Sequence, residues 1–316
     1  MNFPLFPAQA SKVAEQTDYI YWGLLCLSAA VCLIVFVPMV YFLFKYRNGN
    51  PADRTPLELP EYKIEVAWTI VPTLIFMCFY VWGSRQYFLI ERPPPDAMQI
   101  NVIGKQWMWK IQHPEGNREI NELHVPMGRD VKLMMTSEDV IHSFFLPAFR
   151  VKQDVVPGRY TTEWINADKI GTYHLFCSEY CGTSHSLMVG RIIVMSPADY
   201  TSWLAKGQPE PSLVQSGESL FRQLGCSGCH MGNSVIRAPP LEGVFGKPVP
   251  LNDRTVVQAD EGYIRDSILF PAKQIVGGYT NDMPSFTGKV NEEQMLELIA
   301  YIKSLETQSP SPEVRP

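Results

Sequence analysis

Two cysteines, two histidines and a methionine form the first set of residues whose types could bind a metal. Within twelve residues the chain reads CSEYCGTSHSLM, which contains Cys177, Cys181, His185 and Met188, and His142 lies upstream in VIHSFFLP. Thiolate, imidazole and thioether ligands together favour copper. Because a second thiolate exceeds the set of a mononuclear blue-copper site, the spacing predicts two coppers bridged by two cysteines, each with one histidine. Met188 and a backbone carbonyl would then be weak outer ligands.

Two other interpretations of this set remain open from spacing alone. Two cysteines with two histidines are also a structural zinc set, although zinc leaves Met188 without a role. A disulfide between Cys177 and Cys181 fits an oxidising compartment, although it leaves His142 and His185 unexplained. The residues favour copper over both.

A second set of possible ligands, Cys226, Cys229 and His230, lies in the sequence GESLFRQLGCSGCH. C-x-x-C-H is the pattern of covalent c-type haem attachment, in which both thiols bind the haem and the histidine binds its iron. A thioredoxin-like C-x-x-C is the main alternative, but no βαβ pattern surrounds these residues. The other alternative is that the C-x-x-C-H pattern occurs by chance.

The second iron ligand must then come from further along the chain. Met231 adjoins His230 and cannot easily reach the opposite face of a haem. Met295 lies in NEEQMLELIAYIKSL, an amphipathic helical pattern in which methionine is more often a core residue. Met283, in NDMPSF, lies on a predicted loop before that helix, and Met/His ligation raises the haem potential. We therefore predict Met283 as the distal ligand.

The first ninety residues indicate where these sites are positioned. Residues 19–44 and 64–90 contain long apolar runs without charge and predict two transmembrane helices. The first run is too long for the core of a cleaved signal peptide. The loop between the runs is basic, with Lys45, Arg47, Arg54 and Lys63. The positive-inside rule places this loop in the cytoplasm, so both termini and the later domains are expected outside it.

The pattern changes twice after the N-terminal segment, residues 1–92. Residues 93–197 hold short apolar segments such as VKLMMTS and GRIIVMS, punctuated by glycine and proline, which predict an antiparallel β-sandwich or barrel. Residues 198–212 are polar and rich in proline, so we predict a linker. Residues 213–308 then form the second unit, and 309–316 form a tail.

The overall composition narrows the class of protein. A chain of 316 residues fits about two domains, and 46% hydrophobic residues excludes a disordered chain. The formal net charge of -5 argues against a basic nucleic-acid-binding protein. Seven cysteines, an odd number, argue against a simple disulfide framework.

The motif C-x-E-x-C-x3-H-x2-M, preceded by IHSFFLPAFRVKQDVVPGR, resembles subunit II of the haem–copper cytochrome c oxidases. GKQWMW at 104–109 and EVAWTIVP at 65–72 resemble the same family, and the similarity covers about residues 15–196. This resemblance implies a two-helix membrane hairpin, an all-β cupredoxin-like domain and a dinuclear CuA centre. The copper ligands that it implies are His142, Cys177, the backbone carbonyl of Glu179, Cys181, His185 and Met188.

The same resemblance implies roles for three further groups. The side chain of Glu179 would bind a magnesium ion shared with subunit I, Trp107 would be the aromatic residue at which electrons arrive, and Glu65 would lie at the entrance of a proton channel. The residues alone also allow a buried sandwich tryptophan for Trp107 and a solvated or snorkelling carboxylate for Glu65. Met108 and Phe144 stand where many family members have Tyr and Trp, and neither is a ligand position.

The second unit resembles class I cytochrome c, an all-α fold, over about residues 213–306. The matching sequences include APPLEGVFGK, YIRDSILFPAKQIVGGY and MPSF. Pro239 matches the proline whose carbonyl orients the haem histidine, and Ala238 stands where glycine is usual. The implied haem c ligands and attachment sites are Cys226, Cys229, His230 and Met283.

Together the resemblances imply subunit II of a caa-type cytochrome c oxidase in a bacterial inner membrane, with its metal domains on the periplasmic side. Electrons from a cytochrome c or a quinol-oxidising complex would pass from haem c to CuA and then to haem a in subunit I. There oxygen would be reduced to water, coupled to proton translocation. The implied partners are subunits I and III, with no nucleic acid.

Two alternatives share this electron-transfer design. One is a CuA-containing nitric oxide reductase, and the other is a membrane-anchored electron carrier without a catalytic partner. Glu65 and Glu179 favour the oxidase, because both positions serve subunit I in that family. Three further histidines, His113, His124 and His174, are interpreted as structural or surface residues.

Overall fold

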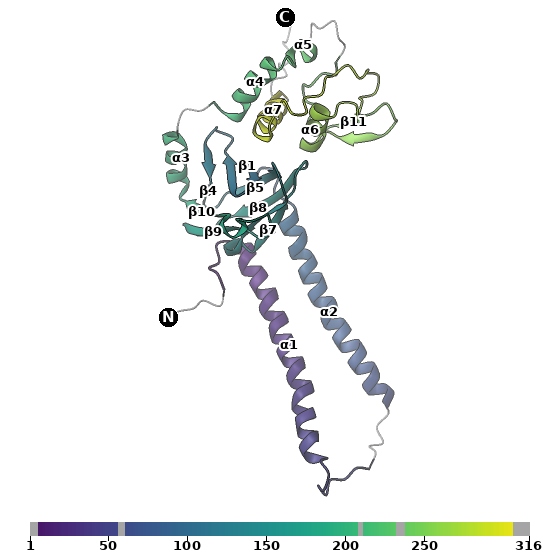
Figure 1. The fold of residues 1–316 in the computed structure, drawn as a ribbon. Coiled ribbons are helices and arrows are strands. Elements are labelled where there is room, and N and C mark those ends of the chain that lie inside the picture. The colour runs from purple at the N-terminus through teal and green to yellow at the C-terminus, as the bar shows by residue number, and fades with distance from the viewer. Residues whose placement is uncertain (1–5, 56–60, 208–210, 232–237, 306–316) are drawn as a thin grey trace, which may run out of the picture.

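The computed structural model describes residues 6–55, 61–207, 211–231 and 238–305. Two long helices come first, followed by a β domain and then a mostly helical domain (Figure 1). The helices are α1 Lys12–Lys45, α2 Glu61–Glu91, α3 Pro197–Lys206, α4 Leu213–Gln223, α5 Ser227–His230, α6 Glu261–Leu269 and α7 Glu292–Ser304, with short 3-10 turns η1 Pro147–Phe149 and η2 His185–Leu187. The strands are β1 Met98–Lys105, β2 Met108–Gln112, β3 Arg118–Ile120, β4 Glu122–Pro126, β5 Asp130–Ser137, β6 His142–Leu146, β7 Val151–Val155, β8 Thr161–Asn166, β9 Gly171–Cys177, β10 Val189–Met195, β11 Pro248–Pro250 and β12 Val256–Gln258.

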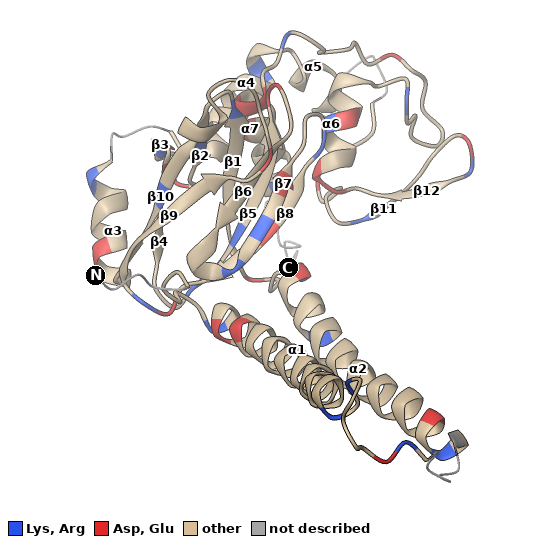
Figure 2. Cartoon of the chain, turned by 60° about the horizontal axis from the view of Figure 1, so that its bottom comes forward, with Lys and Arg blue, Asp and Glu red and all other residues tan. Residues whose placement is uncertain are grey.

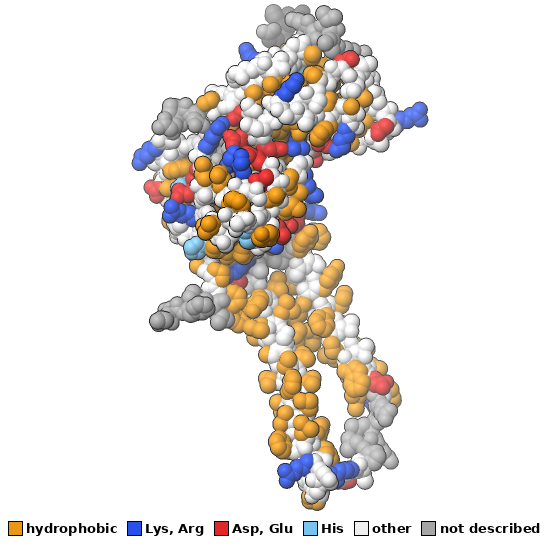
Figure 3. Space-filling model, viewed as in Figure 1, with side chains coloured by type: hydrophobic (Ala, Val, Ile, Leu, Met, Phe, Trp, Pro, Cys, Tyr) orange, Lys and Arg blue, Asp and Glu red, His pale blue; other side chains and the backbone are white. Residues whose placement is uncertain are grey.

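The first two helices are long and apolar enough to cross a membrane. Mean hydropathy reaches 2.6 in Lys12–Lys45 and 1.8 in Tyr62–Glu91, and none of either apolar stretch is buried within the chain. Hydrophobic side chains cover both helices in Figure 3, and the charged residues of Figure 2 lie toward their ends. Such a surface is stable only against lipid or other helices. The side chain of Ser11 accepts from the backbone N–H of Ala14, so α1 begins before the expected residue 19.

The helix hairpin is attached to the β domain at both of its outer ends. Arg150 forms two bonds of 2.9 Å to the Asp18 carboxylate, from Nε and from Nη2, in the paired geometry typical of strong arginine–carboxylate contacts. Trp164 Nε1 donates to the backbone oxygen of Leu89 at 3.1 Å. Since Asp18 belongs to α1 and Leu89 to α2, each helix is held separately.

The β domain is a sandwich of two five-stranded sheets, as the alternating segments predict. One sheet has the order β3-β2-β1-β5-β8 and the other β4-β10-β9-β6-β7. Pairing is antiparallel except for β1 with β5 and β10 with β4. Apolar side chains of both sheets fill the space between them, among them Trp109, Leu133, Phe144, Leu175 and Ile192.

The composition predicts a linker over residues 198–212, but the structure places helix α3 at 197–206. Ser196 caps this helix by accepting from the backbone N–H of Asp199. Tyr200 is only 4% exposed, and Trp203 packs against the same core. These aromatic residues give the polar segment one apolar face, which holds it on the β domain. Residues 208–210 of the expected linker, and the expected tail 309–316, lie outside the described residues.

In the helical domain, α4 packs closely against α7. A Cβ atom at Gly217 would lie 2.0 Å from the backbone oxygen of Glu297, so only glycine allows this crossing. α7 begins with a capping box in which Asn291 and Gln294 each accept from the other's backbone N–H. The small ladder of β11 and β12 is an addition to the expected all-α fold.

The helical domain rests on the outer face of the first sheet, where apolar and charged contacts alternate. Leu296 of α7 packs with Ile103 and Met134 of the β domain. Lys110 Nζ lies 2.8 Å from Glu293 Oε1. In Figure 3 basic and acidic side chains gather between the two domains. A further set of contacts crosses the same boundary: Arg118–Glu297, Arg265–Gly158 and Lys303–Gln99.

Candidate functional site

The register of three strands brings the predicted copper ligands together. β6 begins at His142 and β9 ends at Cys177, and the two strands pair with Phe144 opposite Cys177. The backbone N–H of Cys177 donates to the oxygen of Met188 at 3.1 Å, which places Met188 beside it at the start of β10. Main-chain ladders therefore position ligands that lie up to 46 residues apart in the sequence.

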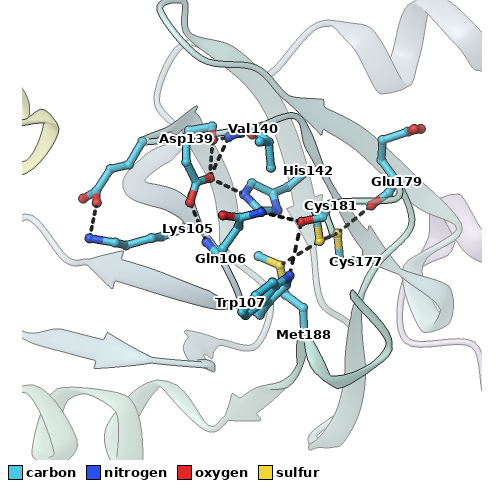
Figure 4. A network of polar contacts seen from close by, with 12 residues as sticks. Lys105, Gln106, Trp107, Asp139, Val140, His142, Cys177, Glu179, Cys181 and Met188 are labelled. Atoms are coloured by element: carbon cyan, nitrogen blue, oxygen red, sulfur yellow. Dashed lines mark hydrogen bonds and ion pairs between the residues drawn. The ribbon is translucent and has the colours of Figure 1, made fainter. Parts of the chain in front are cut away.

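The ligand atoms form one compact group (Figure 4). The Sγ atoms of Cys177 and Cys181 are 3.8 Å apart, and His185 Nδ1 is 3.4 Å from Cys181 Sγ. Met188 Sδ is 3.8 Å from the same sulfur. One ring nitrogen of His142 and both cysteine sulfurs lie within 4.8 Å of one another. All five predicted side chains thus share one site.

The group fits bridging copper better than the two alternatives. A separation of 3.8 Å is far beyond a disulfide bond of about 2.0 Å, yet one ion can touch both sulfurs at a thiolate–metal distance of about 2.3 Å. Met188 lies inside the group, which zinc would not require. His142 is fully buried, and its Nδ1 has no hydrogen-bond partner in the part of the chain that the structure describes. A buried nitrogen of this kind is satisfied when it binds a metal.

Glu179 presents two groups in different directions. Its backbone oxygen lies 3.2 Å from Cys177 Sγ, whereas its carboxylate is exposed and points away from the sulfurs in Figure 4. The carbonyl therefore faces the sulfurs, and the carboxylate faces away from them.

Asp139 holds His142 in one orientation. Its Oδ1 lies 2.9 Å from His142 Nε2, and its Oδ2 accepts from the backbone N–H of Gln106 at 2.8 Å. Partial burial raises the pKa of Asp139, but the hydrogen bonds from Gln106, His142 and Val140 outweigh it and hold this pKa below its ordinary value. The carboxylate therefore stays ionised and keeps the proton on Nε2, so Nδ1 is left for a metal.

Trp107 is hydrogen-bonded to the backbone of Cys181, one of the predicted copper ligands. Its Nε1 donates to the backbone oxygen of Cys181 at 3.2 Å, and Gln106 Nε2 donates to the same oxygen at 2.8 Å. The turn that carries both donors follows Gly104, where a Cβ atom would lie 2.9 Å from the His142 ring. The GKQWMW segment therefore packs against the cluster through a glycine and bonds to it through an indole.

The two thiols differ in acidity without metal. Burial raises the pKa of Cys177. His142 and the backbone N–H of Ser143 lower this pKa by a larger amount, so the net shift is downward. Burial and the charge of Cys177 raise the pKa of Cys181. The Cys177 thiol is therefore the more acidic of the two, and metal binding through both sulfurs must release any proton that they still carry.

The second predicted set borders a large apolar cavity in the helical domain. The cavity has a volume of about 440 Å³, and Cys226, Cys229 and His230 line it. His230 Nδ1 lies 2.9 Å from the backbone oxygen of Pro239, which orients the ring and leaves Nε2 for a ligand. The cavity and this orientation fit a covalently attached haem.

The three methionines considered as distal ligands lie in different places. Met283 is half-buried and lines the cavity. Met231 is 45% exposed and does not line it. Met295 is 1% exposed and belongs to the helical core around α7. Of these three described methionines, only Met283 faces the space that a haem would fill.

Glu65 and three histidines stand apart from both sites. Glu65 is exposed on α2, near the end that lies away from the β domain (Figure 1). His174 is exposed and stacks on Phe176. His113 and His124, interpreted from the sequence as structural or surface residues, both contact the carboxylate of Glu119. Nothing in their sequence spacing indicates this contact, because His113 follows β2 and His124 lies on β4 of the other sheet.

Three family models match successive parts of the chain. Residues 1–83 match the transmembrane domain of cytochrome c oxidase subunit II, residues 117–196 match the periplasmic domain of the same subunit, and residues 214–306 match cytochrome c. The subunit II match implies CuA, and the cytochrome c match implies haem c.

Curated relatives are named for the same subunit, and the matches to this chain span most of their length. The chain is 29% identical over 313 residues to cytochrome c oxidase subunit 2 of Alkalihalophilus pseudofirmus, covering 92% of this chain and 88% of the relative. It is 30% identical over 223 residues to probable cytochrome c oxidase subunit 2 of Rickettsia bellii, covering 63% of this chain and 82% of the relative.

Among solved structures, the chain is similar to the periplasmic domain of subunit II of cytochrome oxidase of Bradyrhizobium japonicum. The identity is 32%, the TM-score is 0.36, and the match covers 37% of this chain and 96% of that chain. The sequence matches, the paired apolar helices, the cupredoxin-like sandwich and the helical C-terminal domain agree. The chain belongs to the cytochrome c oxidase subunit II family and carries a cytochrome c domain behind the family's periplasmic domain.

Proposed function

We propose that this chain is the electron-transfer subunit of a caa-type cytochrome c oxidase. It accepts electrons at haem c, passes them to dinuclear CuA and delivers them to haem a in subunit I, where oxygen is reduced to water and protons are translocated. The observation that carries the proposal is that one chain holds both a sulfur–imidazole cluster and a haem-sized cavity, in two domains packed against each other.

The geometry of the two sites supports the ligands that we propose. The CuA ligands are His142, Cys177, the carbonyl of Glu179, Cys181, His185 and Met188. The haem c residues are Cys226, Cys229, His230 and Met283. When bound, these groups supply reversible one-electron redox chemistry at a fixed protein geometry.

The chain's own residues position these groups for transfer. Asp139 fixes the His142 ring, which reduces the movement that a change of redox state requires. Trp107 is half-buried and bonded to the carbonyl of Cys181, so its ring joins the domain surface to the cluster. We propose Trp107 as the residue at which electrons arrive.

Packing between the domains supports transfer within one molecule. Lys110 bridges Glu293 of the cytochrome domain, at 2.8 Å, and Glu138 of the CuA domain, at 2.9 Å. Glu138 is next in sequence to Asp139, so this contact ends beside the copper cluster. A tethered and docked donor acts at high effective concentration, unlike a separate cytochrome that must diffuse.

The remaining roles concern partners outside the chain. The exposed carboxylate of Glu179 would bind magnesium at subunit I, and the exposed Glu65 would lie at the entrance of a proton channel of the complex. The basic loop between α1 and α2 orients the hairpin with its metal domains on the periplasmic side of a bacterial inner membrane. The other proposed partners are subunit III and an electron donor, which is a cytochrome c or a quinol-oxidising complex.

The decisive experiment is flash-induced electron transfer in the intact oxidase. The rate of CuA reduction by haem c is expected to be independent of protein concentration and nearly independent of ionic strength. Trp107→Ala is expected to slow this step with both metal spectra intact, whereas Trp107→Phe, which keeps a ring, slows it less. A rate proportional to protein concentration would instead favour a carrier that serves other complexes.

Magnesium binding is tested separately. Glu179→Gln is expected to retain copper through the unchanged backbone carbonyl and to weaken manganese bound in place of magnesium, measured by EPR of the complex. Glu138→Gln, in the same domain but bonded to lysines, is the matched control. Unchanged manganese binding in Glu179→Gln would rule out the side-chain role.

A further inference from the structure

Helix α7 lies between the haem cavity and the first sheet of the CuA domain (Figure 1). Leu298 and Ile302 of this helix line the cavity. Leu296 packs instead with Ile103 and Met134, on the outer face of the sheet. Residues two apart in a helix point about 200° apart around its axis, so Leu296 and Leu298 occupy opposite sides of α7. One helix therefore touches both the haem space and the β domain.

Strand β1 continues this contact through the sheet to the copper cluster. Side chains alternate between the two faces of a strand, so Ile103 points outward to α7 and Gly104 faces inward. Gly104 approaches His142 so closely that a Cβ atom there would lie 2.9 Å from the imidazole ring. Two adjacent residues of one strand thus connect Leu296 of the cytochrome domain with a proposed copper ligand.

A hydrogen-bonded branch joins β1 to the same histidine. The backbone oxygen of Gly104 accepts from the backbone N–H of Glu138 at 3.0 Å. The next residue, Asp139, lies 2.9 Å from His142 through its carboxylate. The His142 ring is fully buried, so no water separates it from these neighbours. His142 is therefore coupled to β1 both by direct packing and by hydrogen bonds.

Trp107 makes a different set of contacts. It packs with the core of the CuA domain and donates to the backbone oxygen of Cys181. Ile103, by contrast, belongs to the apolar cluster that contains Leu296 of the cytochrome domain. The rate of electron tunnelling falls steeply wherever bonded or closely packed atoms give way to a gap. A packed contact between the two domains therefore favours transfer at that contact.

We propose that the tethered haem also reduces the copper pair by way of α7 and β1, with His142 as the ligand at which these electrons enter. This inference rests on the proposed function, since it requires haem c and CuA in the same chain. Each transfer moves one electron: the iron goes from ferrous to ferric, and the oxidised copper pair gains that electron without a proton. Transfer by this route adds to transfer through Trp107, so the two rates sum.

The test compares two variants of one contact in the haem- and copper-loaded oxidase. Ile103→Ala removes the β1 side of the contact. Met134→Ala, the matched control, removes a side chain of the same cluster from β5, a strand that carries none of the proposed copper ligands. Flash-induced reduction of CuA by haem c should slow several-fold in Ile103→Ala and keep nearly its original rate in Met134→Ala. When Trp107→Ala is also present, Ile103→Ala should cause a larger fractional loss, because the parallel route is already weakened.

Three measurements on the same samples separate the route from the integrity of the fold. The CuA EPR signal, the haem potential and the hydrogen exchange of the α7 amide groups should be the same in Ile103→Ala as in Met134→Ala. Both variants open a gap in the same cluster, so they should loosen the docking of the two domains equally. A difference in transfer rate between them then reports the connection through β1.

Three results would overturn the proposal. An unchanged rate in Ile103→Ala would do so, and equal slowing in both variants would mean that the cluster only holds the domains together. Slowing accompanied by faster α7 exchange in Ile103→Ala alone would attribute the effect to undocking. If Ile103→Ala fails to assemble, Leu296→Ala decides, because it removes the same contact from the cytochrome side. A rate proportional to protein concentration in the unchanged protein would instead contradict the proposed function itself.

Discussion

In the CuA domain the proposed ligands touch one another directly, whereas in the cytochrome domain they surround a cavity of about 440 Å³. The copper ligands are held by strand ladders and by Asp139, which do not depend on the metal. Of the haem residues, Cys229 and His230 lie in α5 whereas Met283 lies on a loop before α7, and the cavity lies between them. The difference teaches that copper is added to a formed scaffold, while haem is itself part of the core of its domain.

The largest effect is expected when haem attachment is prevented by Cys226→Ser with Cys229→Ser. Without haem the apolar walls of the cavity would face water and would lose the group that they pack against, so the helical domain should be strongly destabilised. We expect limited proteolysis of the full chain to cleave within residues 213–306 and to spare the CuA domain. A protease-resistant cytochrome domain in this variant would contradict the conclusion that haem forms part of the core of that domain.

The corresponding change in the CuA domain is expected to remove metal but not fold. Cys177→Ser with Cys181→Ser should reduce copper from two ions per chain to none and abolish the mixed-valence EPR signal. The cost in unfolding free energy should be about 1–3 kcal/mol, as for other buried substitutions. Cys78→Ser, in the second membrane helix, should keep both coppers. One zinc and no copper in the unchanged protein would contradict the CuA assignment.

A smaller effect is expected from exchanging one haem ligand. Met283→His should lower the haem potential and abolish the weak near-infrared sulfur–iron band, while the covalent haem keeps the domain folded. Met295→Leu, a change within the helical core, should leave the band in place. If the band survives in Met283→His and is lost in a Met231 or Met295 variant, Met283 is not the distal ligand.

The smallest effect is expected at the charged boundary between the domains. The Lys110 side chain is 24% exposed, and ion pairs of this kind contribute at most about 1 kcal/mol. Lys110→Gln should therefore slow haem-to-copper transfer by less than about fivefold and make it more sensitive to salt. Lys105→Gln removes a lysine that pairs with Glu138 within the CuA domain, so transfer should not change.

Local patterns predicted much of this architecture. Apolar runs indicated both membrane helices, alternation indicated the sandwich, and the spacing of Cys177, Cys181 and His185 indicated one cluster. Helix α3 was missed because proline and glycine nearby concealed the apolar face made by Tyr200 and Trp203.

Contacts that depend on strand register could not be predicted from the sequence. Glu119 meets His113 because β2 and β3 pair with Ile111 opposite Glu119, and a shift by one residue would turn the carboxylate outward. Alternating polar residues in short strands otherwise indicate solvent exposure. The position of Asp139 on the His142 ring likewise depends on a loop shape that three residues of spacing do not fix.

The separate attachment of the two membrane helices has a mechanical consequence. A rigid body joined to a support at one flexible point keeps three rotations, while a body joined at two points keeps only one, about the line between them. Arg150 on Asp18 and Trp164 on Leu89 are two such points. The outer domains are therefore expected to rotate less freely above the bilayer than a domain attached to a single helix would.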